Sequence, residues 1–328
     1  MSEPLVHVRD LNVRFVSRDA TVHAVNGVSF DLAERESLCI LGESGSGKSV
    51  TLRALMALNP PRRTKLSGTV RVGGHDIIAA SERKMADIRG STVSMIFQEP
   101  MTALDPVFTI GRQIAETVMR HERVSRAEAD KRALELLELV QIPSAKRRLA
   151  AYPHELSGGL RQRAMIAIAL SCRPKLLLAD EPTTALDATV QIQILLLLRR
   201  LQQEMGMGVI FVTHDLGVAG EIADRVAVMY AGKFIEEGPV RDLMRNPLHP
   251  YAQGLLGATV HAGMRGERLT TIPGAPPNLE RVPQGCAFAP RCPYVGEECL
   301  PEVPAFRGPV PGHAARCVRV PDAMTQAA

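Results

Sequence analysis

Short apolar runs alternate with helical patterns along the first two-thirds of the chain. Residues 5–16 alternate apolar and polar positions, as a half-buried strand does. Continuous apolar runs are typical of strands that are buried on both faces, and they recur at Ser37–Leu41, Val93–Phe97, Leu176–Ala179, Val209–Thr213 and Val226–Tyr230. Helical patterns fill most of the intervals between these runs. The alternation predicts an α/β fold with a largely parallel sheet.

Two stretches depart from this alternation. Residues 110–140 carry apolar positions at helical spacing without a strand pattern, which predicts a helical insert. Of the 23 prolines, 14 follow residue 238, and proline is excluded from helix interiors and central strands. We therefore expect a main domain, a helical subdomain within it and a separate C-terminal module, at residues 1–237, about 99–170 and 238–328.

Composition and charge exclude several classes of protein. The net charge of +4 is small, the chain has no block rich in lysine and arginine, and it has only 4 Tyr, 8 Phe and no Trp. These features argue against a nucleic-acid binder. No apolar run approaches the roughly 18 residues of a membrane helix, and the first residues lack a signal-peptide core. We expect a protein on the cytoplasmic side, associated with a membrane only through partners, with its six cysteines reduced or metal-bound.

A glycine-rich loop follows the first continuous apolar run and precedes a helical pattern. Its spacing, G-x-x-x-x-G-K-S, is that of a phosphate-binding loop. Backbone N–H groups of such a loop surround an anion, the lysine adds a point charge, and the final serine binds Mg²⁺. We predict a nucleoside triphosphate with Mg²⁺ here, in contact with Gly42, Glu43, Ser44, Gly45, Ser46, Gly47, Lys48, Ser49 and Val50.

Two adjacent carboxylates, Asp180 and Glu181, end the apolar run that begins at Leu176. In an open α/β sheet the ligand lies at the carboxyl ends of the strands. Asp180 is therefore expected to hold Mg²⁺ together with Ser49, and Glu181 to polarise the attacking water. Taken alone, the pair could equally be solvated acids at the entrance to a loop.

A second anion-binding pattern precedes the helical stretch 164–170. Ser157 is a typical N-cap residue, and Gly158 and Gly159 expose backbone N–H groups at the start of a helix. Alone, this pattern indicates no more than a good helix cap. Two such sites in one chain suggest that the nucleotide lies between two protein copies.

The order of these segments resembles the motif set of ABC ATPases. The resemblance rests on the loop at 42–49, Gln98 after its strand, residues 156–159 (LSGG), residues 176–182 (LLLADEP), residues 185–187 (ALD) and His214. Further segments resemble the ATP-binding subunits of bacterial oligopeptide and dipeptide importers: residues 98–104, 152–159, 229–232, 249–251 and 272–279.

The resemblance implies roles for individual residues. Gln98 would sense the γ-phosphate and Mg²⁺, and His214 would bridge the γ-phosphate and Glu181. Phe15 would stack on adenine, with Phe30 as the neighbouring alternative. Leu160 stands where the commonest pattern has glutamine, a change that leaves the signature contacts in place. The residues implied to act across a dimer are Ser157, Gly158, Gly159 and Asp187.

The resemblance also implies a function and partners. ATP hydrolysis would power peptide uptake through two permease subunits, a second and paralogous ATP-binding subunit, and an extracytoplasmic substrate-binding protein, with no nucleic acid. Similar subunits serve nickel and glutathione, which are alternative substrates. Non-transport ABC proteins carry a long coiled-coil insert or tandem cassettes, and this chain has neither pattern. A small-molecule kinase would have no use for Ser157 together with Asp187 and His214.

The C-terminal module carries four of the six cysteines: Cys286, Cys292, Cys299 and Cys317. They could be scattered buried thiols. They could also form a structural zinc site, although the usual C-x₂₋₄-C pairs are absent. The resemblance to peptide-importer subunits favours a [4Fe–4S] cluster, which also takes four thiolates. Cys39 and Cys172 lie beside apolar runs and are expected to belong to the core.

Overall fold

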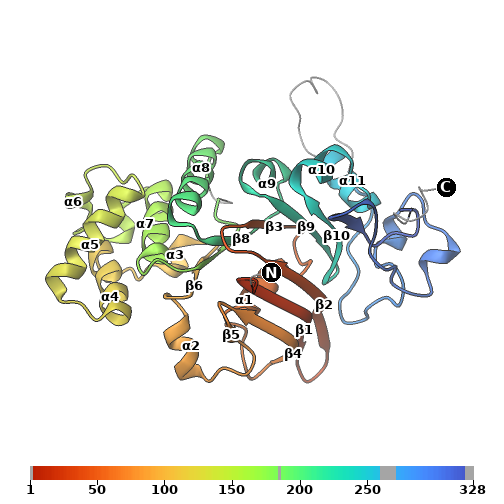
Figure 1. The fold of residues 1–328 in the computed structure, drawn as a ribbon, viewed down its shortest axis with the longest axis horizontal. Helices are drawn as coiled ribbons and strands as arrows, with labels where there is room; N and C mark the ends of the chain where they lie inside the picture. The colour runs from red at the N-terminus through yellow and green to blue at the C-terminus, as the bar shows by residue number, and fades with distance from the viewer. Residues whose placement is uncertain (1–2, 184–185, 259–270, 322–328) are drawn as a thin grey trace. The chain divides into compact units, whose positions relative to one another are not determined.

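The computed structural model describes residues 3–183, 186–258 and 271–321 (Figure 1). The chain folds as two compact units, each made of separate stretches. The first consists of Met1–Val6, Asp31–Glu36 and Arg71–Phe211, and the second of His7–Phe30, Ser37–Val70 and Val212–Ala328. The predicted domain boundaries at 237 and 238 follow the sequence rather than this division, and they stay predictions.

Parallel strands form the centre of the first unit. Strands β6 (Val93–Ile96) and β7 (Leu176–Asp180) pair in parallel, with Val93 opposite Leu176 and Ile96 opposite Ala179. Strand β8 (Gly208–Thr213), which begins in this unit, lies next to β7. Every residue of β6, β7 and β8 is buried, which explains their continuous apolar sequences. The strands predicted from these runs are confirmed.

Helices make up most of the rest of the first unit, and α4–α7 lie together in Figure 1. Thr109 and Ser125 cap α4 and α5, each accepting a backbone N–H with its side chain, so both helices begin where such residues predict a start. The helical insert is confirmed. The helices of this unit are α2 (Glu82–Ile88), α3 (Pro100–Ala103), α4 (Ile110–Glu122), α5 (Arg126–Leu139), α6 (Ala145–Arg148), α7 (Gly158–Leu170) and α8 (Ala188–Met205).

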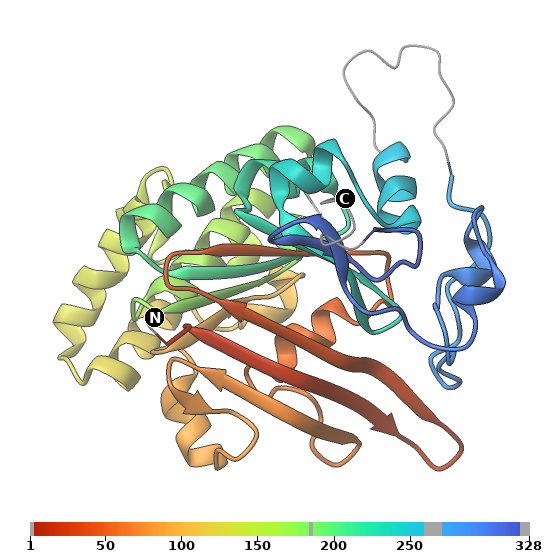
Figure 2. The ribbon, with the colours of Figure 1, turned by 45° about the vertical axis from the view of Figure 1, so that its right-hand side comes forward.

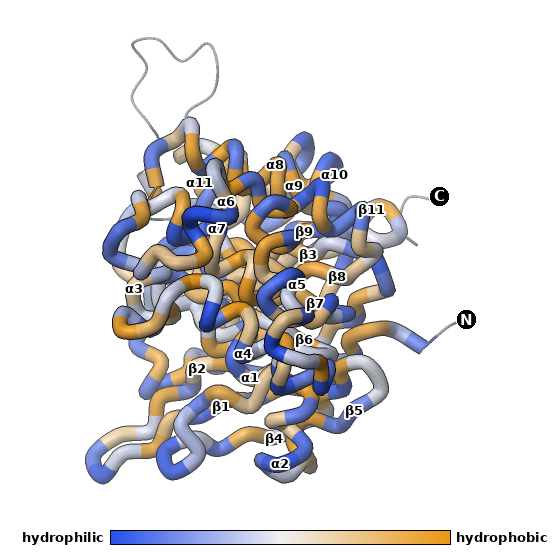
Figure 3. The backbone as a smooth tube through the Cα atoms, turned by 90° about the vertical axis from the view of Figure 1, so that its left-hand side faces the viewer, coloured by the Kyte–Doolittle hydropathy of each residue, from blue (hydrophilic) through white to orange (hydrophobic). Residues whose placement is uncertain are grey.

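The second unit contains a mixed sheet in the order β11-β12-β10-β9-β3. Strands β3 and β9 pair in parallel, and β10 and β12 continue the sheet with antiparallel pairs. Most residues of β3 and β9 are hydrophobic and buried, and Figure 3 colours the backbone by this hydropathy. The elements are β3 (Ser37–Leu41), α1 (Lys48–Ala54), α9 (Leu216–Ile222), β9 (Arg225–Tyr230), β10 (Lys233–Pro239), α10 (Val240–Arg245), α11 (Pro250–Gly257), β11 (Arg307–Val310) and β12 (His313–Ala315).

A second sheet holds long strands that run side by side in Figure 2. Its order is β2-β1-β4-β5. Strand β1 (Val6–Val16) is the predicted alternating strand, whereas β2 (Thr21–Leu32) and β4 (Thr64–Val72) were not predicted. Their burial is irregular, because polar and half-exposed residues interrupt the alternation. The short β5 (His75–Asp76) pairs with the end of β4.

One buried carboxylate organises the proline-rich C-terminal segment. Glu236 on β10 is fully buried and accepts hydrogen bonds from the backbone N–H groups of Leu248 (2.9 Å) and His249 (2.7 Å). Its Oε1 also lies 2.8 Å from Nε2 of His313 on β12. These bonds hold the start of α11 and strand β12 on β10. The segment is thus fixed by side-chain contacts where prolines prevent long regular elements.

The described residues contain no helix that is both long and apolar enough to cross a membrane.

Candidate nucleotide site

The predicted phosphate loop connects β3 to α1 in the second unit. Lys48, the first residue of α1, is only 4% exposed. Its Nζ donates to the carbonyl oxygens of Gly42 (2.7 Å) and Glu43 (2.9 Å). The two bonds fold the loop around the ammonium group and fix the position of its charge. A lysine held in this way can attract the outer phosphates of a nucleotide, because its side chain is already ordered.

Two glycines shape the loop. Gly47 has φ of 107°, and a Cβ there would lie 2.3 Å from the carbonyl oxygen of Ala24, so a side chain is excluded. Gly45 has φ of 79°, and a Cβ there would meet no atom within 4 Å. In the described part of the chain, the buried Oγ of Ser46 has no hydrogen-bond partner. A buried hydroxyl without a partner can donate to an acceptor oxygen, such as one of a phosphate.

In the first unit, two predicted catalytic side chains meet. Asp180 ends β7 and is 1% exposed, and Glu181 follows it with φ of 45°. Nε2 of Gln98 donates to Oε2 of Glu181 over 3.3 Å, although 83 residues separate them. They meet because β6 and β7 are parallel neighbours, so the segments that follow the two strands begin at the same edge of the sheet. A carboxylate and an amide placed together can orient a water molecule.

The second predicted anion site lies at the start of α7. Ser157 is the N-cap residue and is exposed, but its hydroxyl makes no capping hydrogen bond. Asp187 caps α8 by accepting the backbone N–H of Val190 over 3.0 Å, so it has a structural role in addition to the predicted one. Ala185 of the same motif lies outside the described residues.

His214 and Phe15, both in the second unit, complete the predicted set. His214 follows β8 and is exposed, next to Asp215, which caps α9. Phe15 is half-buried on β1. Phe30 is 4% exposed and packs against Phe234 with ring centroids 5.7 Å apart, so it belongs to the core. Phe15 therefore remains the candidate for contact with adenine.

The four C-terminal cysteines line one cavity, which also contains His249. Burial raises the pKa of the thiols of Cys286, Cys292 and Cys317, and none of these cysteines forms a disulfide. Within the described ranges, however, no group of three or more His, Cys, Asp or Glu residues is arranged to hold a metal ion. The structure thus gathers the cysteines without forming a ready single-ion site, and a bound metal or cluster stays a prediction.

The remaining two cysteines differ in their surroundings. Cys39 on β3 is fully buried, and burial strongly raises the pKa of its thiol, as expected for a core residue. Cys172 is only half-buried, and its Sγ donates to the carbonyl oxygen of Thr117 over 3.7 Å. Neither thiol has the environment of a reactive cysteine.

Sequence reasoning did not predict one contact of the phosphate loop. Glu43 forms an ion pair with Arg291 of the C-terminal segment, 248 residues away, with Nη1 and Oε2 2.8 Å apart. The only available signal was the position of Arg291 directly before Cys292.

Comparison with known proteins places the chain in a family. The model of the ABC transporter family matches residues 25–184, and that of the oligopeptide/dipeptide transporter C-terminal region matches residues 235–299. A peptide import ATP-binding protein of Brucella melitensis is 49% identical over 97% of both chains. A peptide ABC transporter ATP-binding protein of Sinorhizobium fredii is 50% identical over 96% of this chain and 95% of its own length.

Solved structures agree with this assignment. A dimeric ATP-binding cassette in a post-hydrolysis state bound to ADP and Pi has a TM-score of 0.65 and 30% identity, covering 72% of this chain and 99% of its own. The cassette cbiO1 of Clostridium perfringens, part of an ABC transporter complex, has a TM-score of 0.63 and 27% identity, covering 75% and 92%. The chain belongs to the ABC transporter ATP-binding proteins, with the α/β fold of their ATPase cassette. It is an ATPase of that family.

Proposed function

We propose that the chain hydrolyses ATP to power the uptake of di- and oligopeptides across a cytoplasmic membrane. The observation that carries this proposal is the near full-length likeness to peptide import ATP-binding proteins, which includes the C-terminal region. Nickel and glutathione are weaker alternatives, because the reported relatives carry peptide names. A non-transport role has no support from the matched families.

Within the proposed reaction, the loop at 42–49 holds the phosphates and Lys48 neutralises their charge. Ser49, Gln98 and Asp180 would hold Mg²⁺, which would screen the negative charge of the phosphates during the reaction. Glu181 accepts a proton from the attacking water, and Gln98 orients that water. His214 bridges the γ-phosphate and Glu181, Val50 contacts the nucleotide, and Phe15 stacks on its adenine. The support for joining these residues in one reaction is the motif order that the chain shares with its family.

The proposed ATP site is completed by a second ATP-binding subunit, through its counterparts of Ser157, Gly158, Gly159 and Asp187. The exposed Ser157 hydroxyl, which does not cap its own helix, supports this proposal. The dimer found in a related cassette supports it as well. We propose a paralogue as the second subunit, which is the pairing that the resemblance to peptide-importer subunits favours.

We propose that two permease subunits anchor the protein at the cytoplasmic face of the membrane and receive peptides from an extracytoplasmic binding protein. The support is an exposed apolar surface after β6. Phe97, Met101 and Val107 are 38%, 48% and 68% exposed, which is unusual for side chains of this size so close together. The domains proposed for these tasks remain residues 1–237, with the helical subdomain at about 99–170, and residues 238–328.

Peptide uptake should depend on the charge of Lys48. In cells that lack this chain, wild-type protein should restore uptake of a labelled tripeptide, and Lys48→Ala should restore less than about a tenth of it, because the phosphates lose their fixed cation. Uptake is measured as label retained after filtration, with protein levels checked by immunoblot. Equal restoration by both proteins would exclude ATP binding by this loop from the function. A parallel uptake assay with labelled nickel tests the alternative substrate.

We further propose that the four-cysteine cavity takes a metal centre, a [4Fe–4S] cluster or alternatively zinc. The donor set fits both, because both take four cysteine thiolates. The convergence of residues separated by up to 31 positions on one cavity supports the proposal. Such a centre would fasten a segment that has little regular structure, so its binding free energy would add to folding.

Anaerobically purified protein should be brown, with about four iron atoms per chain. Cys292→Ser should lose the colour and make residues 286–317 more sensitive to protease, whereas Cys172→Ser, outside the cavity, should keep both properties. Metal content is measured by mass spectrometry and the colour by visible absorption. One zinc per chain would replace the cluster with the alternative. Protein free of metal after anaerobic handling would contradict both.

A further inference from the structure

The C-terminal segment contributes a buried arginine to the phosphate loop. Arg291 binds both carboxylate oxygens of Glu43, with Nη1 to Oε2 at 2.8 Å and Nη2 to Oε1 at 3.1 Å. The arginine side chain is 5% exposed and the glutamate side chain 28%. A bidentate pair of this kind is charge-assisted and fixes the orientation of both partners.

The other donors of Arg291 are also used. Nε donates to the carbonyl oxygen of Pro273 at 2.8 Å, Nη2 to that of Ile272 at 3.4 Å, and Nη1 to the hydroxyl of Tyr230 at 3.2 Å. Glu43 further raises the already high pKa of the guanidinium. The arginine is thus a fixed positive charge whose fork is aimed at the loop by a complete set of acceptors.

Each polar group of Glu43 is held by a different partner. Its N–H donates to the hydroxyl of Tyr251 at 2.9 Å, its carbonyl oxygen accepts from Lys48 at 2.9 Å, and its carboxylate is bound by Arg291. Glu43 therefore connects the loop to the C-terminal segment. Two of these partners, Tyr251 and Arg291, come from residues beyond 238.

Aromatic packing and backbone bonds keep this arrangement rigid. The rings of Tyr230 and Tyr251 both pack against Phe288, with centroids 5.4 Å apart in each pair. Arg291 ends a 3₁₀ turn, and its N–H donates to the carbonyl oxygen of Phe288 at 2.9 Å. The turn lies between Cys286 and Cys292, two of the cysteines that line the cavity.

The charge of Glu43 is the part of this arrangement that bears on ATP. Glu43 is the second residue of the loop that is proposed to bind a polyphosphate, so its carboxylate has the same charge sign as the ligand. Unpaired, that carboxylate would repel the phosphates and could compete with them for the ammonium of Lys48. Bound by Arg291, it is neutralised and its position is fixed.

We propose that Arg291 is a positioning residue for nucleotide binding, which neutralises Glu43 and keeps its carboxylate from opposing the phosphates of ATP. The proposal rests on the proposed role of the loop at 42–49. In this proposal the C-terminal segment affects ATP affinity directly, because the side chain of Arg291 contacts the loop.

The test is a double-mutant cycle on Mg-ATP affinity, measured by calorimetry with the full-length chain. Arg291→Met removes the charge and keeps most of the side-chain volume, and it should weaken Mg-ATP binding about tenfold, because one carboxylate is left unpaired beside the ligand. Adding Glu43→Gln to that variant should restore the affinity to within about twofold of wild type. The loss in Arg291→Met should shrink at high salt, since screening weakens repulsion.

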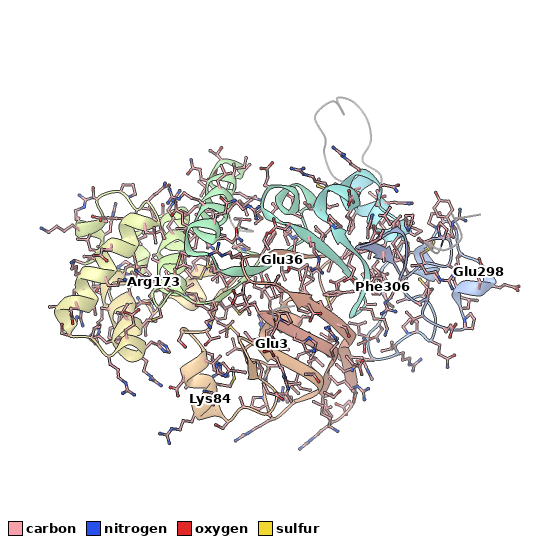
Figure 4. All side chains as sticks on the ribbon, in the orientation of Figure 1. Glu3, Glu36, Lys84, Arg173, Glu298 and Phe306 are labelled. Atoms are coloured by element: carbon pink, nitrogen blue, oxygen red, sulfur yellow. The ribbon has the colours of Figure 1, made fainter. Side chains whose placement is uncertain are left out.

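A matched control is Arg316→Met. Arg316 also belongs to the C-terminal segment and is half-buried, with its guanidinium 4.3 Å from the ring centre of Phe306, which Figure 4 labels. Its hydrogen bonds go to the carbonyl oxygens of Phe234 and Pro304, neither of which belongs to the loop at 42–49. Its replacement should leave Mg-ATP affinity unchanged. Circular dichroism before each titration confirms that every variant is folded.

Any of three results would overturn the proposal. Unchanged affinity in Arg291→Met would show that the ion pair does not matter for ATP. A loss that Glu43→Gln fails to restore, or that Arg316→Met reproduces, would show that the segment supports the loop only structurally. These outcomes are distinct from failure of the proposed function, in which wild-type protein itself would not bind Mg-ATP, or would bind it no better than Lys48→Ala.

Discussion

Glu181→Gln should lower ATP turnover by about 10²-fold or more while leaving Mg-ATP affinity close to wild type. The expected factor is that for loss of a positioned general base. The change keeps the size of the side chain and its contact with Gln98, but glutamine cannot accept a proton from water. Affinity should survive because the loop at 42–49, rather than Glu181, is proposed to bind the phosphates.

Phosphate release under saturating Mg-ATP measures the turnover, and calorimetry measures the affinity. Glu204→Gln makes the same chemical change at an exposed acid that is paired with Arg200 on α8, and it should leave both values unchanged. Near-normal turnover in Glu181→Gln would remove this residue from the mechanism. Parallel loss of affinity would instead indicate a damaged fold around β7.

Ser157→Arg should abolish ATP-dependent association of the ATP-binding subunits while leaving ATP binding by each subunit intact. The serine is exposed at the start of α7 and its hydroxyl does not cap that helix, so little within the chain depends on it. An arginine would place a long side chain where the nucleotide of the second subunit is proposed to lie. The loss should therefore appear in dimer closure alone.

Light scattering with Mg-ATP measures this association in a Glu181→Gln background, which should accumulate the closed dimer because hydrolysis is blocked. The paralogous subunit is included where the source organism has one. Ala127→Arg adds the same side chain at an exposed position of α5 and should associate as the parent does. Normal association of Ser157→Arg would refute a role for this segment in the dimer.

The buried strands could be predicted because burial on both faces leaves an unbroken apolar run. The strands β2 and β4 were missed for the opposite reason. Only Val70 and Val72 of Thr64–Val72 are buried, and Gly68 interrupts the alternation, so its apolar pattern is weak. Both β-propensity and the pattern of apolar residues reflect burial. A strand that is half exposed to solvent therefore gives a weak signal in both.

The meeting of Gln98 with Glu181 could also be anticipated, since both residues follow parallel buried strands. The pairing of Glu43 with Arg291 could not. It depends on the path of a segment rich in proline, whose course is set by side-chain contacts such as those of Glu236 rather than by a repeating pattern. The resemblance to peptide-importer subunits indicated a common site for the four C-terminal cysteines, and the shared cavity supports that prediction.

The most direct measurement of the central claim is an experimental structure of the Glu181→Gln protein with Mg-ATP and its second ATP-binding subunit. We predict a nucleotide whose γ-phosphate contacts Lys48 of this chain and the signature serine of the other subunit, with Ser157 on the second nucleotide. A nucleotide enclosed by this chain alone, with Ser157 facing solvent, would contradict the claim that ATP is bound between two subunits.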